Sequence, residues 1–395
     1  MKKRFLVFCD YYLPGYKSGG GMFTVANLID RFVDRYEFFV VTRNHESKGN
    51  REPYTSVKTN AWNKVGNATV FYVSNETMNR TTFARLFAEV APDAVYLNSA
   101  FSMPVITFLN ARRKRLIRDV PVILAPCGEL SVGALSTKPL KKKAFLKYSK
   151  FVDLYRDVTW KASFSAEEDE IRSLMGRDVE VMIAPDLAPR IILPDYSVDQ
   201  KPAKVPGEGR FVFLSRLTRK KNIEYFLERL EYIKQGKVHF EIIGPIENET
   251  YWRQCDAIIK RLGPNVTVKA VGAMHRPEAL ARLVKSHFFV LPTLGENFGY
   301  AFIEALAAGS PLLISENTVW TDVEDRNVGW IRNLSDDEGW KNLIQKCVDM
   351  DQPEFDRLSL NARKYAVEWL AQPAHDAATA NVLNRALDSA DTAAM

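Results

Sequence analysis

The chain has 395 residues, of which 46% are hydrophobic, 26% charged and 11% aromatic. This length favours two domains, and this balance excludes a disordered, fibrous or disulfide-scaffold protein. The net charge of +6 is uneven, because residues 1–195 carry 29 lysines and arginines against 21 acidic residues, whereas residues 196–395 carry 25 against 27.

The N-terminus joins a basic start to a short apolar run, Phe5–Cys9. A secretory signal needs an apolar run of about 7–15 residues, so this one predicts a buried first strand. The four cysteines lie far apart with no C-x-x-C pair, at Cys9, Cys127, Cys255 and Cys347. This spacing favours reduced cysteines over a zinc site or a disulfide framework. Because no apolar run reaches about 18 residues, we expect a cytoplasmic protein without a membrane-spanning helix.

In the first half of the chain, short apolar runs alternate with helical patterns. The predicted strands are Arg4–Cys9, Glu37–Thr42, Thr69–Val73, Ala94–Leu97, Val120–Ala125 and Val179–Ala184. The predicted helices are Gly20–Tyr36, Thr82–Val90 and Ser165–Met175. Strands of nearly continuous Val, Ile and Phe character, separated by helices, are typical of a parallel sheet covered on both faces.

The second half repeats this alternation. The predicted strands are Arg210–Leu214, Val238–Ile243, Val266–Ala270, Phe288–Leu291 and Leu312–Ser315. The predicted helices are Ile223–Leu230, Glu249–Leu262, Pro277–Lys285, Tyr300–Ala308, Asp337–Met350 and Glu354–Trp369. The pattern again predicts a doubly wound α/β domain.

Between the two series, residues 185–209 hold five prolines and two glycines, a density that suits an interdomain linker. We therefore expect a Rossmann-like domain over residues 1–190, a linker over 191–209, a second Rossmann-like domain over 210–370, and a terminal helix over 371–395 that packs back toward the first domain. Ligands of such domains bind beyond the carboxyl ends of the strands, which predicts a site in a cleft between them.

The positive charge of the first half gathers in two stretches. One is Arg112–Arg115 together with Arg118, and the other is Lys138–Lys150, with six lysines and apolar residues between them. The second pattern predicts a basic amphipathic helix that contacts an anionic membrane, and a solvated helix face is the equal alternative. We expect no nucleic-acid partner, because the excess is local and no nucleic-acid motif accompanies it.

A loop and helix after the strand Phe288–Leu291 carry two glutamates, Glu296 in the loop and Glu304 in the helix. Their spacing is slightly over two helical turns, so both point to roughly the same side. Two carboxylates at a strand end can bind the vicinal hydroxyls of a sugar or a ribose. The N–H groups of Asn297–Gly299 at the helix start can face a phosphate or a sugar oxygen. By spacing alone, a surface helix with a chance pair of glutamates is the favoured interpretation.

A second segment, Phe211–Asn222, is predicted as a strand, a polar turn and a helix start. Arg216 and Lys221 leave the end of this strand, and a guanidinium fork with a point-charge ammonium is what a diphosphate needs. Such cations stabilise the transition state when negative charge grows on the leaving group. We expect Arg219 and Lys220 to face solvent, and an exposed basic turn is the alternative for the whole segment.

A third segment follows the first strand, where Gly19, Gly20 and Gly21 open a predicted helix. Glycines at a helix start let the backbone approach a ligand closely. The pattern is neither G-x-G-x-x-G nor a Walker motif, so by itself it is a weak signal. The missing dinucleotide fingerprint also argues against a dehydrogenase.

In this order, the three segments resemble the retaining glycosyltransferases of family 4. These have the GT-B fold, in which two Rossmann-like doubly wound α/β domains face each other across a cleft. The resemblance covers nearly the whole chain, and its specific parts are the pair Glu296 and Glu304 in E-N-F-G…E-A-L-A-A-G, the pair Arg216 and Lys221, and Gly19-Gly20. Residues 126–135 and 315–320 resemble a subset that builds bacterial surface polysaccharides such as O-antigen, capsule and exopolysaccharide.

The resemblance implies a reaction and a donor site. A hexosyltransferase of this family would move a sugar from a nucleoside diphosphate, UDP in preference to GDP, to a hydroxyl of a glycan or lipid-linked oligosaccharide. The anomeric configuration would be retained, by front-face attack, and no metal or other cofactor is expected. The implied donor-site residues are Gly19, Gly20, Arg216, Lys221, Glu296, Asn297, Phe298, Gly299 and Glu304.

Within that site the resemblance assigns separate roles. Arg216 and Lys221 would bind the diphosphate, Glu304 the ribose hydroxyls and Glu296 the transferred sugar. The catalytic residues would accordingly be Glu296, Arg216 and Lys221, with no protein nucleophile. The backbone at Gly20 and at residues 297–299 would complete the site.

The acceptor side carries fewer signals. Cys127 stands where the polysaccharide subset often has an arginine, and Glu129 is the nearest acidic residue, with a structural cap as its alternative role. Asn222 stands where many relatives have glycine after the phosphate-binding lysine. His275 is a minor candidate for the nucleotide base. The one D-x-D, at residues 349–351, falls at a predicted helix end and predicts solvated surface.

Two alternatives share this fold: a nucleotide-sugar epimerase and a catalytically idle GT-B partner subunit. An epimerase would need more acid and base side chains in the first domain than the sequence offers. An idle subunit is opposed by the presence of all four charged donor-site residues, Arg216, Lys221, Glu296 and Glu304.

Overall fold

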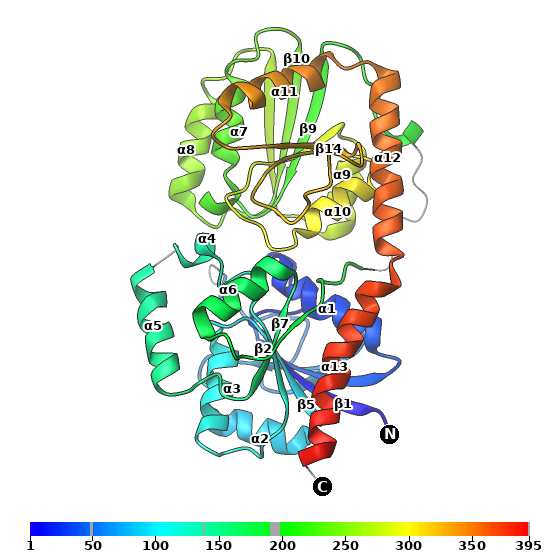
Figure 1. The fold of residues 1–395 in the computed structure, drawn as a ribbon. Helices are drawn as coiled ribbons and strands as arrows, with labels where there is room; N and C mark the ends of the chain where they lie inside the picture. The colour runs from blue at the N-terminus through cyan, green and yellow to red at the C-terminus, as the bar shows by residue number, and fades with distance from the viewer. Residues whose placement is uncertain (48–49, 137–138, 190–197, 394–395) are drawn as a thin grey trace. The chain divides into compact units, whose positions relative to one another are not determined.

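The computed structural model describes residues 1–47, 50–136, 139–189 and 198–393. The chain forms two compact units, one of residues 1–189 and 373–395 and the other of residues 190–372 (Figure 1). Lys138 of the basic stretch, and residues 191–197 of the predicted linker, lie outside the described residues.

The first unit is built on an eight-stranded sheet in the order β3-β4-β2-β1-β5-β6-β7-β8. Its strands are β1 (Lys3–Phe8), β2 (Tyr36–Arg43), β3 (Trp62–Val65), β4 (Ala68–Val73), β5 (Ala94–Asn98), β6 (Val122–Ala125), β7 (Val158–Ala162) and β8 (Val181–Ile183). Neighbouring strands run parallel, except that β3 pairs antiparallel with β4. Along β1, Phe5 and Val7 join one apolar core and Leu6 and Phe8 the other, so this strand is buried on both faces, as its continuous apolar run predicts.

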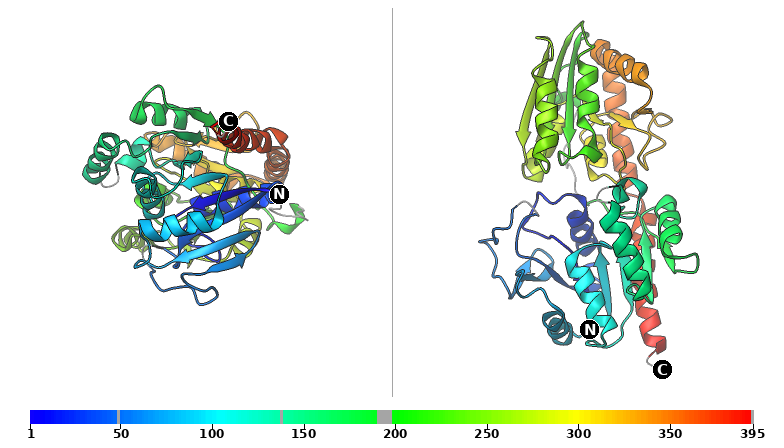
Figure 2. Two further views of the ribbon diagram at one scale, coloured as in Figure 1. Left: turned by 90° about the horizontal axis from the view of Figure 1, so that it is seen from below. Right: turned by 90° about the vertical axis from the view of Figure 1, so that its left-hand side faces the viewer.

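Seven helices of the described chain belong to this unit. They are α1 (Gly20–Phe32), α2 (Arg80–Val90), α3 (Met103–Arg113), α4 (Val132–Leu135), α5 (Pro139–Phe151), α6 (Ser165–Met175) and α13 (Pro373–Ala393). The last of these contacts β5 and β6, and its Leu383 lies in the same core as Phe5 (red helix in Figure 1). The two views of Figure 2 show the helices of this unit on both faces of its sheet.

The second unit has a six-stranded parallel sheet in the order β11-β10-β9-β12-β13-β14. Its strands are β9 (Glu208–Leu214), β10 (Lys237–Ile243), β11 (Val266–Gly272), β12 (Phe288–Leu291), β13 (Leu312–Ser315) and β14 (Gly329–Arg332). Its helices are α7 (Ile223–Leu230), α8 (Glu249–Ile259), α9 (Arg276–Val284), α10 (Tyr300–Ala307), α11 (Asp337–Asp349) and α12 (Gln352–Leu370). Both units are therefore doubly wound α/β domains, which confirms the predicted fold class.

Most predicted elements are confirmed, but some boundaries were wrong. The helix expected over Gly20–Tyr36 ends at Phe32, because Tyr36 pairs with Lys3 as the first residue of β2 and its ring packs 5.1 Å from that of Phe5. Residues 208–209, expected in the linker, belong to β9. Strands β3, β7 and β14 were missed. No clear strand signal marks β7 in the sequence, because this strand contains Lys161. The ammonium of this lysine is buried 2.6 Å from Asp186 Oδ1.

Two lysines bind the described part of the linker to the second unit. Lys201 Nζ donates to the carbonyl of Ser286 at 2.6 Å and to Ser310 Oγ at 2.9 Å. Lys204 Nζ donates to the carbonyls of Val348 and Met350 at 2.9 and 2.8 Å. Both amino groups thus donate to buried carbonyls at the C-terminal ends of α9 and α11. Their bonds are structural.

Candidate functional site

The turn after β9 carries the two predicted phosphate-binding cations. Arg216 lies just beyond the strand, and Lys221 ends a short 3₁₀ turn, Arg219–Lys221. The next residue, Asn222, adopts φ of 55° and ψ of 35°, a left-handed conformation that glycine and asparagine enter most readily. This explains why asparagine can stand at a position where relatives have glycine.

Lys221 and Glu296 form a buried ion pair. Their side chains are 10% and 14% exposed, and the Lys221 ammonium contacts Glu296 Oε2. Burial by itself would raise the pKa of Glu296, but the attraction of Lys221, with smaller contributions from Lys220 and Arg216, holds that pKa below its usual value. The structure therefore brings three predicted residues into one charged cluster, and Glu296 is a carboxylate at neutral pH.

The loop that presents Glu296 is fixed by its own backbone. The backbone N–H of Glu296 donates to the carbonyl of Asn317 at 3.0 Å. Three residues later Gly299 adopts φ of 74° and precedes α10, and a Cβ at this position would lie 2.6 Å from the Phe302 ring and 2.8 Å from Glu296 Cγ. Glycine is thus required here by both conformation and space.

Phe298 anchors this loop to the interior. Its ring is buried and lies 5.6 Å from that of Trp320 and 5.2 Å from that of Trp369, and the indole N–H of Trp320 donates to its carbonyl at 2.7 Å. Only the backbone N–H of Phe298 is then suited to a ligand, which agrees with the backbone role predicted for residues 297–299. Trp320 belongs to the 315–320 run, and its part in fixing the loop was not predicted.

Glu304 has a partner that the sequence did not reveal. This carboxylate is buried on α10, and Oε1 lies 2.8 Å from Nη2 of Arg276, the first residue of α9. Burial raises the pKa of Glu304, and Arg276 offsets part of that rise. The sequence signal for this partner was a basic residue at the start of the helix before β12, next to His275.

The remaining cations of the turn are held less tightly. Arg216 Nη1 lies 2.9 Å from Glu247 Oε1, and these side chains are 39% and 35% exposed, so this ion pair contributes little to stability. Arg219 is exposed, as predicted, and donates to Gln254 at 2.7 Å. Lys220 was expected to face solvent but is half-buried, and its carbonyl accepts hydrogen bonds from Thr293 and Leu294.

In the first unit, the glycine segment lies at the start of α1. Gly19 adopts φ of 83° as the residue before the helix. Asn98, at the end of β5, donates from Nδ2 to the carbonyl of Gly21 at 2.9 Å, and its Oδ1 lies 3.3 Å from Cys127 Sγ. The thiol pKa of Cys127 is raised by burial. The structure thus connects the glycine segment, including Gly20, to the Cys127 turn through one asparagine.

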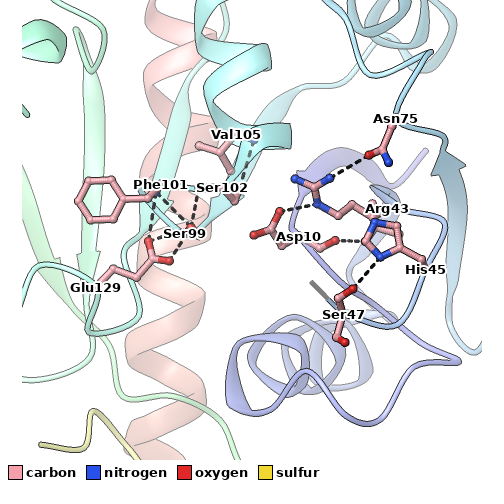
Figure 3. A network of polar contacts seen from close by, with 11 residues as sticks. Asp10, Arg43, His45, Ser47, Asn75, Ser99, Phe101, Ser102, Val105 and Glu129 are labelled. Atoms are coloured by element: carbon pink, nitrogen blue, oxygen red, sulfur yellow. Dashed lines mark hydrogen bonds and ion pairs between the residues drawn. The ribbon is translucent and has the colours of Figure 1, made fainter. Parts of the chain in front are cut away.

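Glu129 has the structural role that was left open for it. Its carboxylate accepts hydrogen bonds from Ser99 Oγ at 2.8 Å and from the N–H groups of Ala100 and Phe101 at 2.8 and 3.1 Å (Figure 3). These groups lead into α3, so the side chain caps the turn before that helix. Burial raises the pKa of Glu129. With its oxygens bonded to the backbone, Glu129 is poorly placed to act as a base.

A second polar group at this edge of the sheet was not predicted. Arg43, the last residue of β2, donates from Nε to Asp10 at 3.0 Å and from Nη1 to Asn75 at 3.3 Å (Figure 3). Nearby, Nδ1 of His45 lies 3.1 Å from the carbonyl of Ser47, and burial lowers the pKa of this histidine. The sequence signal for this polar group was a charged residue near the end of each strand, Asp10 after β1 and Arg43 at the end of β2.

Within the described residues, no three His, Cys, Asp or Glu side chains gather where they could hold a metal ion, and no helix is long and apolar enough to cross a membrane. The D-x-D segment is surface structure, since Asp351 caps α12 by accepting from the N–H of Glu354 at 2.9 Å. His287 is fully buried and bonded to backbone, whereas His275 precedes α9.

The two doubly wound units, with this cluster at the carboxyl ends of β9 and β12, define the GT-B fold. Solved structures with this fold are similar over nearly the whole chain. Sucrose-phosphate synthase from Thermosynechococcus elongatus has a TM-score of 0.75 at 15% identity, covering 98% of this chain and 100% of that one. HepE from Anabaena, in a complex with UDP and glucose, has a TM-score of 0.69 at 15% identity, covering 97% and 100%.

A third structure, α,α-trehalose 6-phosphate synthase from Burkholderia multivorans, has a TM-score of 0.64 at 13% identity and covers 100% of this chain and 98% of that one. Residues 197–365 match the family model for glycosyl transferases group 1. This match covers most of the second unit, residues 190–372. Comparison with curated protein sequences gave no match.

Proposed function

We propose that the protein is a retaining hexosyltransferase of family 4. It moves a sugar from a nucleoside diphosphate, UDP in preference to GDP, to a hydroxyl of a glycan or lipid-linked oligosaccharide. The observation that carries this proposal is the cluster of Lys221, Glu296 and Arg216 at the strand ends of the unit that matches the group 1 glycosyl transferase model. Similar structures in complexes with UDP and glucose and with UDP-glucose support the choice of UDP.

In the proposed reaction, the acceptor oxygen forms a bond to the anomeric carbon as the bond from that carbon to the donor phosphate breaks. The acceptor proton passes to the leaving phosphate oxygen, so no protein base is required. Arg216 and Lys221 bind the diphosphate, whose negative charge grows, and stabilise the transition state. Glu296 binds hydroxyls of the transferred sugar, Glu304 those of the ribose, and the N–H groups of residues 297–299 complete the donor site.

Donor binding then requires an exchange of partners. Arg216 must leave Glu247, which costs little since this ion pair is exposed to solvent. Lys221 has only to share its ammonium between Glu296 and a phosphate, because an ammonium has three N–H donors. We propose that no metal or other cofactor takes part, since Arg216 and Lys221 would supply two cations to neutralise the diphosphate.

A thermal-shift screen with UDP, GDP, CDP, ADP and NAD tests the donor assignment. At 100 times the dissociation constant a bound nucleotide should stabilise the protein by about 2.7 kcal/mol. We expect the shift with UDP and its loss in Glu304→Ala. A shift with none of the nucleotides would contradict the proposal and favour an idle partner subunit. Reversible conversion of the nucleotide sugar without an acceptor would favour an epimerase.

We further propose that α5 places the first unit on an anionic membrane, where bacterial polysaccharide synthesis on lipid-linked acceptors takes place. Its sequence has five lysines and no acidic residue. Leu146 and Ser149 are buried, whereas Leu140 and Phe151 are 83% and 89% exposed. The helix lies at the rim of its unit in Figures 1 and 2. Exposed apolar side chains flanked by lysines match an anionic lipid surface.

A triple variant, Lys141→Ser, Lys143→Ser and Lys147→Ser, tests this contact. Lys142 is retained because its Nζ donates to the carbonyl of Ala134 at 2.7 Å. At about 1 kcal/mol per lysine, binding to vesicles with anionic lipid should weaken about 100-fold, with UDP binding unchanged. The matched control removes the exposed charges of residues 113–115. Equal vesicle binding by the triple variant would make α5 a solvated face.

A further inference from the structure

Arg276 and Glu304 form an ion pair, with Nη2 of Arg276 2.8 Å from Oε1 of Glu304. Glu304 is the only charged residue of α10, and β13 has none. Arg363, on the neighbouring α12, donates to the carbonyl of Ala307 at 2.8 Å. Arg276 is thus the charged side chain that acts on the buried Glu304 carboxylate within the described chain.

The orientation of this pair follows from the two helices. Arg276 begins α9, and Glu304 lies in the second turn of α10, so the ion pair joins two helices that pack against each other. Without a nearby cation, burial raises the pKa of a carboxylate further and so favours its protonated form. A protonated carboxyl group loses acceptor capacity, and binding two neighbouring hydroxyls needs both of its oxygens as acceptors.

We propose that Arg276 is a positioning residue for the donor, holding the Glu304 carboxylate so that it receives the hydroxyls of the donor's ribose. This inference rests on the proposed function and extends it to a residue outside the three donor segments of the sequence. Arg276 acts through Glu304 and need not touch the nucleotide.

The experiment compares the dissociation constants of UDP and 2′-deoxy-UDP by calorimetry for the wild type, Arg276→Gln and Glu304→Gln. A charge-assisted hydrogen bond is worth about 1.5–3 kcal/mol, so the wild type should prefer UDP by about 10-fold or more. In Arg276→Gln this preference should fall to nearly one, as in Glu304→Gln. The double variant should be no weaker than either single variant, because both remove the same contact.

The pH dependence gives a second readout that a merely structural role would not produce. UDP affinity should fall as pH falls through the pKa of Glu304, and loss of Arg276 raises that pKa, so the fall should occur at higher pH in Arg276→Gln. The titration of the UDP phosphate is common to both proteins and cancels in the ratio of their constants. Arg276→Lys, which keeps a cation, should recover part of the affinity.

Arg282→Gln is the matched control, because Arg282 is on the same helix but pairs with Glu241. It should leave both dissociation constants unchanged. Equal preference for UDP in the wild type and Arg276→Gln, or additive losses in the double variant, would overturn this inference alone. Failure of the wild type to bind any nucleoside diphosphate would overturn the proposed function with it.

Discussion

In the second unit, Glu296 and Glu304 are paired with the side-chain cations Lys221 and Arg276, whereas in the first unit Glu129 and Glu167 are bonded to backbone N–H groups. Glu167 and Glu304 are buried and Glu129 and Glu296 are half-buried, and all four follow strands or lie on helices at strand ends. A backbone N–H cannot turn away without breaking the local fold, but a long basic side chain can change partner. The difference predicts that Glu296 and Glu304 can share or exchange their partners when a ligand binds, whereas Glu129 and Glu167 keep theirs.

The basic residues of the second unit follow the same division. Lys201 and Lys204 donate to backbone carbonyls, but Arg216 and Lys221 pair with carboxylates. Arg216 can leave its exposed partner for a diphosphate and Lys221 can share its ammonium with one, and neither change breaks a backbone hydrogen bond. The predictions below test this division from the largest expected effect to the smallest.

Arg216→Ala should lower kcat about 10²–10³-fold, because the guanidinium is proposed to stabilise the departing diphosphate. The melting temperature should change little, since the ion pair with Glu247 is exposed to solvent. Turnover of a UDP-sugar donor measures the effect.

Arg219→Ala is the matched control for that variant, because this arginine is in the same turn but donates to Gln254. It should keep wild-type turnover. Wild-type turnover in Arg216→Ala would remove Arg216 from the site and leave the division between exchangeable and structural cations unsupported.

His287 extends the comparison to a buried group of the second unit with a structural role. Both of its ring nitrogens form hydrogen bonds with backbone groups. Nδ1 accepts from the N–H of Arg210, Nε2 lies 3.1 Å from the carbonyl of Pro202, and burial lowers the pKa of the ring to about 3. A pKa lowered in the folded state means that stability is present above the unfolded pKa of about 6.5 and is lost as pH falls toward 3.

Between pH 6.5 and 4.5 this loss should approach about 2.7 kcal/mol, at about 1.4 kcal/mol per pH unit. Urea unfolding at the two pH values measures it. His287→Gln should show a smaller pH dependence of its unfolding free energy than the wild type, with UDP binding retained. An identical pH dependence would mean that folding does not lower the pKa of His287.

Glu129→Ala should lower the free energy of unfolding by about 1–3 kcal/mol, because Ser99 and the N–H groups of Ala100 and Phe101 lose a buried acceptor. Turnover per folded molecule should be unchanged. Urea unfolding and steady-state kinetics on the same preparation separate the two effects. Lost turnover with wild-type stability would break the comparison, since it would make Glu129 part of the acceptor site.

The alternation of apolar runs and helical patterns was sufficient to predict two doubly wound domains, because buried parallel strands need continuous apolar sequence. Strand β7 shows the limit of this rule. Lys161 interrupts the apolar run of this strand. Its ammonium is buried with an ion pair to Asp186, 25 residues later, which offsets the desolvation penalty. Such pairing across the sequence leaves no periodic signal.

The sequence was enough to predict the fold class and, through the family resemblance, to single out Arg216, Lys221 and Glu296 as candidates, since each follows the end of a predicted strand. Which charges meet could be seen only in the folded protein: Lys221 with Glu296, Arg276 with Glu304, and Glu129 with the turn before α3. The physical reason is that partners come from different strand ends, brought together by the parallel sheet, and electrostatic attraction depends on distance in space rather than along the chain.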